Sequence, residues 1–527
     1  MALLVFLSLS SIFIFIFFFI LSQKRKVAAP PGPPSLPLVG NLHQLHHSAP
    51  HRSLWQLAQR YGPFMSLRLA AVQTVVVSSA RVAKEILKTH DLNFATRPAF
   101  VGLRKLSYNG LDLGFAPYGP CWRELKKLCI VHLFSANRVQ SFRSVREDEV
   151  AQMLRKLSER EASGTVVNLT EVLMSFTSSL ICIIAFGKKY VGQYEEEVVG
   201  KGKRRSRLQV LLNEAQALLT EFFFSDYFPL LGWVDGLTGK MRRLEKTFKE
   251  LDAFYERVIF EHMDSAMAEN GDDEKEVQDI IDIFLQLLRD DSLSFHLTLD
   301  HIKAVLMNIF IAGTDPPSAT IVWAMTALLK NGEVMRKVQG EVRSLFGEKD
   351  FINEDDIERL PYLKAVVKET LRLFPPSPLL LPREAIERCS VEGYEIEAKT
   401  VVYVNAWGIA RDPENWEKAE EFCPERFVGS EMELKGKEFE ALPFGSGRRM
   451  CPAKHMGMVN VELALANLVH TFDWEVGPGS DREEMLDTEV KPGITMHKKS
   501  DLYVVAKRGQ GSVLMLNLFY FTLILEV

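Results

Sequence analysis

Apolar residues recur every three to four positions over most of the chain, which is the spacing of one face of an α-helix. Shorter runs rich in Val, Thr and aromatic residues, typical of strands, are fewer. No segment repeats at a fixed period. The pattern predicts one mainly α domain with a minor β portion. We expect helices at 150–157, 210–224, 279–288, 302–329 and 362–373, and strands at 64–69, 74–77 and 400–404.

The chain begins with an uncharged apolar run, residues 2–22, followed at once by Lys24, Arg25 and Lys26. About twenty residues make a helix of ~30 Å, enough to cross a bilayer. A secretory signal carries its positive charge before the apolar run, and cleavage after Ala29 would place Pro30 at the cut. Positive charge stays on the cytosolic side. The sequence therefore predicts a single-pass anchor in the lipid bilayer of the endoplasmic reticulum, with the body cytosolic.

Three further segments complete the predicted organisation. Residues 23–40 are basic and proline-rich, so we expect a stiff extended hinge. Residues 41–508 form the main domain, in which polar stretches at 192–207 and 269–276 are expected to be surface loops. Residues 509–527 form an apolar tail that is short for a spanning helix.

The amino-acid composition argues against several classes of function. The chain has 63 Lys and Arg against 68 Asp and Glu, a net charge of −5, which gives no reason to expect a nucleic-acid partner. Six scattered cysteines without a C-x-x-C pair form neither a disulfide framework nor a structural zinc site. A reducing compartment with mostly buried thiols fits this usage.

One cysteine stands in a loop suited to an anionic sulfur. Cys451 follows Phe444, Gly447 and Arg449 in a stretch dense in Gly and Arg, and an apolar helical run follows it. Nearby cations lower the pKa of a thiol, glycines let backbone N–H groups approach, and a helix N-terminus carries positive partial charge. The alternative is a cysteine that serves as a small buried apolar residue.

These residues resemble the haem-binding loop of the cytochrome P-450 family, F-x-x-G-x-R-x-C-x-G, with Ala453 at the last glycine. The resemblance implies the cytochrome P-450 fold, haem b (iron protoporphyrin IX) as cofactor, and the Cys451 thiolate as axial iron ligand. It also implies that Arg449 pairs with a haem propionate, which suits a guanidinium fork.

Two other blocks support the resemblance. Glu369 and Arg372 match the family's E-x-x-R pair, and Arg426 in Pro424–Phe427 matches its P-E-R-F block, which together imply a buried structural triad. Trp122 and Lys126 resemble the W-x-x-x-R element that reaches a propionate, although lysine loses the bidentate fork of arginine. By the same resemblance Arg383 is a propionate contact.

The predicted helix 302–329 resembles the family's oxygen-side helix but departs from it. Asp315 takes the place of the acid that relays protons toward dioxygen, and Thr314 is a polar partner for a bridging water, so both are expected to be catalytic. Pro316 falls where the family has threonine, and Pro317 follows. Two prolines should open the helix and free the carbonyls of the preceding residues for water. The alternative is a kink without chemical consequence.

The resemblance runs from the hinge to Arg508 and is closest to plant A-type members, near a branch with aldoxime-metabolising enzymes. It implies a monooxygenase that oxidises a small to medium lipophilic or aromatic plant metabolite with O2 and electrons from an NADPH–cytochrome P-450 reductase. A haem-thiolate dehydratase or isomerase that needs no O2, and a non-catalytic haem protein, remain alternatives. Substrate-facing segments are expected at 100–113, 218–224, 376–381 and 494–496, which are apolar and aromatic.

Overall fold

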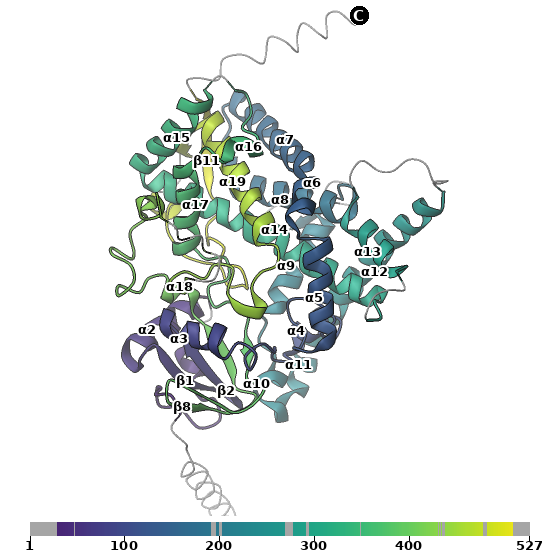
Figure 1. The fold of residues 1–527 in the computed structure, drawn as a ribbon, viewed down its shortest axis with the longest axis vertical. Coiled ribbons are helices and arrows are strands. Elements are labelled where there is room, and N and C mark those ends of the chain that lie inside the picture. The colour runs from purple at the N-terminus through teal and green to yellow at the C-terminus, as the bar shows by residue number, and fades with distance from the viewer. Residues whose placement is uncertain are drawn as a thin grey trace, which may run out of the picture.

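The computed structural model describes residues 29–509 with gaps at 47, 191–195, 200–202, 269–277, 291–294, 348, 431, 433, 435–437 and 478–481. Helices dominate it, as the sequence pattern predicts (Figure 1). The helices are α2 (Pro50–Tyr61), α3 (Ala80–Lys84), α4 (Val101–Leu106), α5 (Pro120–His132), α6 (Ala136–Ser141), α7 (Arg143–Ala162), α8 (Leu169–Phe186), α9 (Arg207–Leu219), α10 (Phe224–Tyr227), α11 (Trp233–Leu237), α12 (Lys240–Ala268), α13 (Ile280–Leu288), α14 (Leu299–Lys330), α15 (Gly332–Phe346), α16 (Glu354–Ile357), α17 (Pro361–Leu373), α18 (Ala406–Ile409), α19 (Lys454–Thr471) and α20 (Arg482–Met485).

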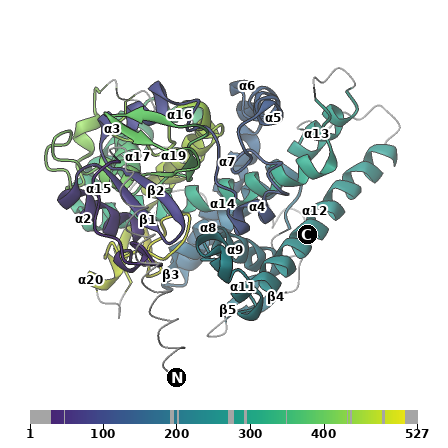
Figure 2. The same cartoon turned by 90° about the horizontal axis from the view of Figure 1, so that it is seen from below.

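Strands β1 and β2 lie at one end of the molecule beside α2 and α3, whereas β11 lies toward the opposite end near α15 (Figure 1). Strands β4 and β5 lie beside α11, apart from β1 and β2 (Figure 2). The larger sheet has the order β1-β2-β9-β6, in which β1 and β2 are antiparallel, β2 and β9 parallel, and β9 and β6 antiparallel. A second sheet has the order β10-β11-β3, and two hairpins complete the described strands. Their bounds are β1 (Phe64–Leu69), β2 (Val72–Val77), β3 (Val167–Asn168), β4 (Glu196–Val199), β5 (Lys203–Ser206), β6 (Arg383–Glu384), β7 (Cys389–Val391), β8 (Tyr394–Ile396), β9 (Val401–Val404), β10 (Phe472–Val476) and β11 (Tyr503–Arg508).

The 32-residue helix α14 runs through the middle of the fold, and nearly all of its side chains are buried. Its most extensive contact is with α8, of whose residues 67% are buried. Within the described ranges α8 alone is long and apolar enough to cross a membrane, with a mean hydropathy of 1.9, but its burial against α14 makes it a core helix. Gly313 permits their close approach, because a Cβ there would lie 2.6 Å from Ile181 Cδ1.

Local signals explain where several helices begin. Asp279 caps α13 in a reciprocal capping box with Asp282, and the Thr298 hydroxyl caps α14 by accepting from the N–H of His301. The predicted helices 150–157, 279–288, 302–329 and 362–373 lie within α7, α13, α14 and α17, give or take one capping residue. The prediction for 210–224 was too long, since α9 ends at Leu219.

One prediction about a connecting segment needs correction. The stretch 192–207 was expected to be a loop, but its described part contains the hairpin β4–β5 and the start of α9. The proline-rich segment lies against the sheet, because Ser66 of β1 donates its N–H to the Pro31 carbonyl (2.8 Å). The apolar run 2–22, the stretch 269–276 and almost all of the tail 509–527 lie outside the described residues.

Candidate functional site: a cavity above a buried thiol

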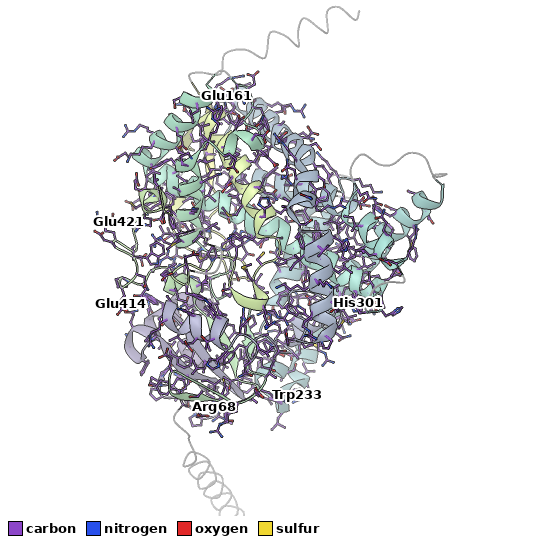
Figure 3. The ribbon with its side chains drawn as sticks, viewed as in Figure 1. Arg68, Glu161, Trp233, His301, Glu414 and Glu421 are labelled. Atoms are coloured by element: carbon purple, nitrogen blue, oxygen red, sulfur yellow. The ribbon has the colours of Figure 1, made fainter. Side chains whose placement is uncertain are left out.

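A cavity of about 350 Å³ lies beside α14 and the loop that precedes α19. Its floor includes Phe444, Gly445 and Cys451, and the opposite wall includes Ala312 and Pro316 of α14. Segments from distant parts of the sequence therefore meet around one thiol. The side chains of the surrounding helices and strands fill the rest of the interior, while labelled residues such as Arg68, Glu161 and Glu414 lie at its edges (Figure 3).

The loop around Cys451 is held by its backbone. Cys451 donates its N–H to the carbonyl of Phe444 (3.0 Å), which closes the loop on itself. Gly447 adopts a φ of +72°, and a Cβ there would lie 2.3 Å from the Leu87 carbonyl oxygen. Only glycine fits that turn. Phe444 thus lines the cavity, whereas Gly447 shapes the loop from outside it.

The net electrostatic effect on Cys451 differs from the expectation. Burial raises the pKa of its thiol, and this outweighs the lowering by the Ala453 backbone, Lys126 and Lys454. The lowering by nearby cations that the sequence predicts is present, but burial outweighs it. A coordinated metal cation deprotonates a thiol outright. Cys451 therefore suits the role of a metal ligand, because a bound cation would stabilise its thiolate.

Two buried guanidiniums and one half-buried guanidinium gather along one edge of the cavity. Arg97, Arg383 and Arg449 all line it, and burial lowers the pKa of each. The charges of Arg383 and Arg449 lower the pKa of Arg97 further, to well below its usual value. Asp91 lies 3.5 Å from Arg383. The cluster therefore has an excess of positive charge and suits a ligand with carboxylates at this edge.

The predicted contacts Trp122 and Lys126 also line the cavity. The indole of Trp122 donates to the Leu113 carbonyl (3.1 Å), and the Arg449 guanidinium lies 3.9 Å above its ring. Lys126 donates to the carbonyl of Arg448, and burial, with the charge of Arg449 second, lowers the pKa of Lys126 to about 8. In this arrangement Trp122 supports Arg449, whereas Lys126 adds a fourth positive charge.

The predicted triad is assembled and buried. The carboxylate of Glu369 accepts two bonds from Arg372 (2.7 and 2.8 Å) and one from Arg426 (3.1 Å). Glu369 and Arg372 are both 0% exposed. Cys423 adds its backbone N–H to Glu369 (2.8 Å). Because Arg426 belongs to the 3₁₀ turn Pro424–Phe427, the triad joins that turn to α17.

On α14 the two prolines face the cavity, whereas Thr314 and Asp315 do not line it. Asp315 is 1% exposed and accepts a bond from His497 Nε2 (2.7 Å). The prolines lie inside a continuous helix, so the expected opening does not occur. Neither proline has an N–H, so the carbonyls of Ala312 and Gly313 lack their usual helical donors.

The remaining wall is mainly apolar. The predicted segments contribute Leu106, Leu113 and Leu219, together with Pro376, Ser377, Leu380, Leu381, Ile494 and Thr495. The expectation fails for the phenylalanine run: Phe222 stacks on Tyr227 (4.7 Å between centroids) and Phe223 is buried elsewhere. The hydroxyl of Ser377 is buried and has no hydrogen-bond partner among the described residues.

Sequence reasoning missed the roles of three site residues. Arg97 was not recognised as one of the buried charges along the cavity. His497 lies in the loop before β11, and nothing local marks it as a partner of Asp315. Asn308 of α14 also holds the cavity loop, since its side-chain oxygen accepts from the N–H groups of Leu113 and Gly114.

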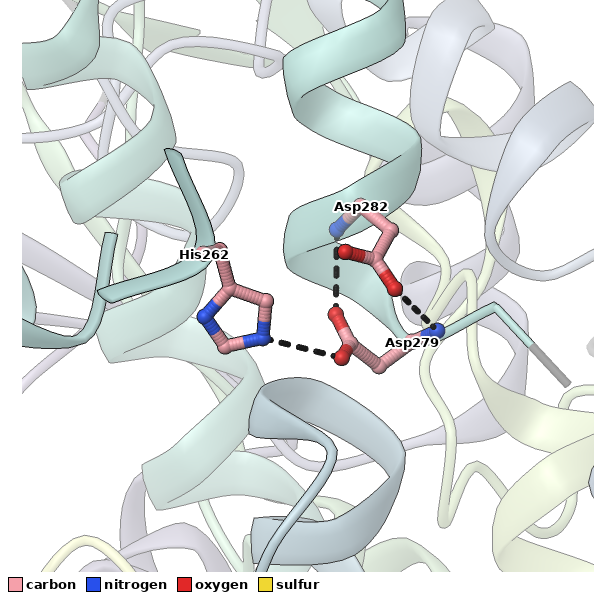
Figure 4. A group of neighbouring side chains, drawn as sticks. All are labelled: His262, Asp279 and Asp282. Carbon is pink, nitrogen blue, oxygen red and sulfur yellow. Dashed lines mark hydrogen bonds and ion pairs between the residues drawn. The ribbon is translucent and has the colours of Figure 1, made fainter. Parts of the chain in front are cut away.

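A second group of potential ligands, His262, Asp279 and Asp282, lies apart from the cavity (Figure 4). His262 bridges the Val258 carbonyl (2.7 Å) and Asp279 Oδ2 (2.9 Å), and the other Asp279 oxygen caps α13. These atoms are already engaged with one another and with the backbone. The group therefore joins α12 to α13.

A half-buried thiol in the floor of an apolar cavity, with four cations along one edge, fits the iron and the two propionates of haem, and this defines a haem-thiolate protein. A model of the family Cytochrome P450 matches residues 30–505. The chain belongs to the cytochrome P450 family, and it is an oxidoreductase of the monooxygenase class.

Relatives of high coverage come from plants. Cytochrome P450 71A1 of Persea americana is 46% identical over 469 residues, which span 89% of this chain and 91% of the relative. The 5-OH-xanthotoxin synthase of Ammi majus is 45% identical and covers 94% and 96%. The 6,7,8-trihydroxycoumarin synthase of Pastinaca sativa is 45% identical and covers 92% and 95%.

A solved structure of a zebra fish cytochrome P450 with abiraterone has the same fold. It superposes with a TM-score of 0.70 at 25% identity, over 87% of this chain and 99% of that one. The prediction of the cytochrome P-450 fold is confirmed.

Proposed function

We propose that this protein oxidises an aromatic plant specialised metabolite of about the size of a coumarin, using O2 and electrons from an NADPH–cytochrome P450 reductase. The observation that carries the proposal is the apolar wall that faces the Cys451 thiol. Relatives of 45% identity are named as synthases of a trihydroxycoumarin and of 5-OH-xanthotoxin. An apolar pocket with few polar groups suits such flat, weakly polar molecules.

The chain's own residues have defined tasks in this proposal. Arg97, Arg383, Arg449 and Lys126 hold the carboxylates of the cofactor, and Cys451 binds its iron. Bound haem supplies the iron at which dioxygen is reduced. Apolar side chains such as Leu380 and Ile494 exclude water, while the free hydroxyl of Ser377 can orient an oxygen of the substrate.

A second function, an O2-independent dehydration or isomerisation of a substrate such as an aldoxime, is favoured by one observation. Pro316 brings a carbon ring to the cavity wall where family monooxygenases carry a hydroxyl. A haem-thiolate enzyme that does not split dioxygen has no need of that hydroxyl.

We also place the protein on the endoplasmic reticulum membrane. Exposed apolar side chains lie at one end of the molecule: Leu38 is 72% exposed, and Leu230 and Leu237 of the α11 region are 92% and 78% exposed. The two areas adjoin, because Gly40 pairs with Leu69 and Ala71 donates to the Tyr227 carbonyl. A clustered apolar surface near the start of the described chain suits contact with lipid.

The test of the function combines purified protein, a plant NADPH–cytochrome P450 reductase and a panel of coumarins, furanocoumarins, phenylpropanoids and aldoximes. Binding spectra rank the compounds, and product formation is then measured with and without O2 and NADPH. We expect a hydroxylated coumarin-type product that requires both. Product formed from an aldoxime without O2 would support the second function instead.

A further inference from the structure

The loop between α20 and β11 crosses α14 beside the cavity. Its residues Ile494 and Thr495 line the cavity, and the next two residues are tied to α14. Trp323 donates its indole N–H to the Met496 carbonyl (2.7 Å), and His497 Nε2 donates to Asp315 Oδ1 (2.7 Å). Asp315 and Trp323 are eight residues apart, or about 12 Å along the helix. The loop is therefore fixed to α14 at two separated points.

The two partners of the His497–Asp315 pair have very different surroundings. The side chain of Asp315 is 1% exposed, whereas that of His497 is 21% exposed. The second carboxylate oxygen, Asp315 Oδ2, is buried and has no partner within the described residues, and the same holds for the neighbouring Thr314 hydroxyl. His497 therefore connects the surface to a buried carboxylate that still has hydrogen-bonding capacity.

Asp315 also adjoins the cavity without lining it. The carbonyls of Ala312 and Gly313, whose residues do line the cavity, lack helical donors because Pro316 and Pro317 have no N–H. The turn of α14 just before Asp315 thus carries polar atoms with unused hydrogen-bonding capacity, and such atoms are able to hold water.

We propose that His497 is the proton-uptake residue of this site and the residue that positions Asp315. The inference rests on the proposed O2-dependent function, because reducing one oxygen atom to water consumes two protons. Histidine suits the task, because its ring can accept a proton at one nitrogen and release one from the other.

The proton transfer balances without any further reactant. The step starts from His497 with both ring nitrogens protonated: the bond between Nε2 and its proton breaks, which leaves a neutral ring, and an O–H bond forms on Asp315 Oδ1. Rotation of the carboxyl group turns this O–H toward the free carbonyls and their water, to which the proton passes. Asp315 is a carboxylate again, and His497 takes a new proton from solvent. One proton enters and one leaves, and no electron moves.

A purely structural role is the competing explanation, in which the pair only pins the loop to α14. His497→Gln and His497→Arg separate the two, because both side chains can donate a hydrogen bond to Asp315 but neither can release a proton near neutral pH. His296→Gln is the matched control, since His296 is exposed on the loop before α14.

The experiment uses the full-length holoenzyme with reductase and an accepted coumarin. We expect both His497 variants to lower kcat roughly tenfold at nearly unchanged KM, to release more hydrogen peroxide per NADPH, and to show a larger solvent deuterium isotope effect. Their reduced carbon-monoxide spectrum should stay that of the wild type. His296→Gln should match the wild type in every respect.

A second readout does not depend on turnover. Unfolding midpoints of His497→Gln, Asp315→Asn and the double variant form a cycle that measures the coupling of the pair. Non-additive shifts together with impaired kcat support the proposal. A wild-type kcat and isotope effect in His497→Arg would leave only the structural role for His497, and this result would overturn the proposal. Product formation without O2 by the wild type would overturn the proposed function itself, and with it this role.

Discussion

The hydroxyl of Thr320 donates to the carbonyl oxygen of Pro316, one turn earlier on α14, at 2.8 Å. Both residues line the cavity. Among the residues of α14 that line the cavity, Thr320 is the first after Pro316 to carry a hydroxyl. That hydroxyl already donates a hydrogen bond. The missing hydroxyl at position 316 is therefore not replaced by the next turn of the helix.

Pro316→Thr should lower hydrogen peroxide release per NADPH on generic substrates by about two- to tenfold, the effect of one hydrogen bond of roughly 0.5–1.5 kcal/mol. On the native substrate we expect little gain or a loss, because that complex already has a path for protons. Pro317→Thr is the matched control. Low leakage in the wild type on all substrates, unchanged in Pro316→Thr, would show that the proline has no role in coupling.

Cys451→Ser should abolish the absorption band of the reduced carbon-monoxide complex that is typical of thiolate haem, and bound haem should fall severalfold. The reason is that a serine hydroxyl in the cavity floor is a poor ligand for haem iron. Cys389→Ser, on the hairpin β7–β8, should retain the band. Retention of the band in Cys451→Ser would assign the iron to another cysteine.

Glu369→Gln should destabilise the fold by about 3–5 kcal/mol, because it leaves the buried guanidinium of Arg372 without its counter-charge. Denaturant unfolding followed by tryptophan fluorescence gives the free-energy difference. Glu333→Gln removes one partner of an exposed ion pair with Lys337 and should change the midpoint very little. Equal effects of the two substitutions would contradict a structural role for the triad.

The contact of His262 with Asp279, which joins α12 to α13, should stabilise the fold less as pH rises. Burial lowers the pKa of His262, but the hydrogen bond and charge of Asp279 more than offset this, so the pKa lies above its usual 6.5. The stabilisation is complete below about pH 6.5 and is lost as pH rises through the folded-state pKa. Thermal unfolding of wild type and His262→Gln from pH 6 to 9 should show a difference that shrinks with pH. A difference that grows with pH would reverse the assigned sign.

Protease added to sealed microsomes should digest the main domain, because Lys24, Arg25 and Lys26 after the apolar run place the body in the cytosol. The measurement is the loss of an epitope tag at the C-terminal end of the chain, and a lumenal protein serves as the protected control. Protection of the main domain until detergent is added would place it in the lumen.

Periodic patterns predicted much of the fold. The helices α13 and α14 follow their apolar spacing closely, and Phe64–Leu69 was predicted to the residue. These elements could be predicted because their signal is local. The hairpin β4–β5 was missed because its strands are polar, and α9 ends early because the aromatic residues after Leu219 pack as a separate cluster.

The site was predictable where a motif is contiguous, as around Cys451, and not where distant segments meet. The pairing of His497 with Asp315 joins residues of two elements that no local pattern relates. The prolines of α14 show a different limit: the rule that proline breaks a helix was outweighed by the dense packing around α14, which keeps the helix continuous. Tertiary contacts therefore decided both outcomes.

The cluster of Arg97, Arg383 and Arg449 also bears on how the protein is made in the cell. Arg97 lies hundreds of residues before the other two arginines, so translation completes its segment long before theirs emerge. Until a dianionic cofactor arrives, mutual repulsion opposes their final placement. The supply of haem should therefore determine the yield and lifetime of the newly made protein. Cells that lack haem should degrade the protein, because its fold is incomplete.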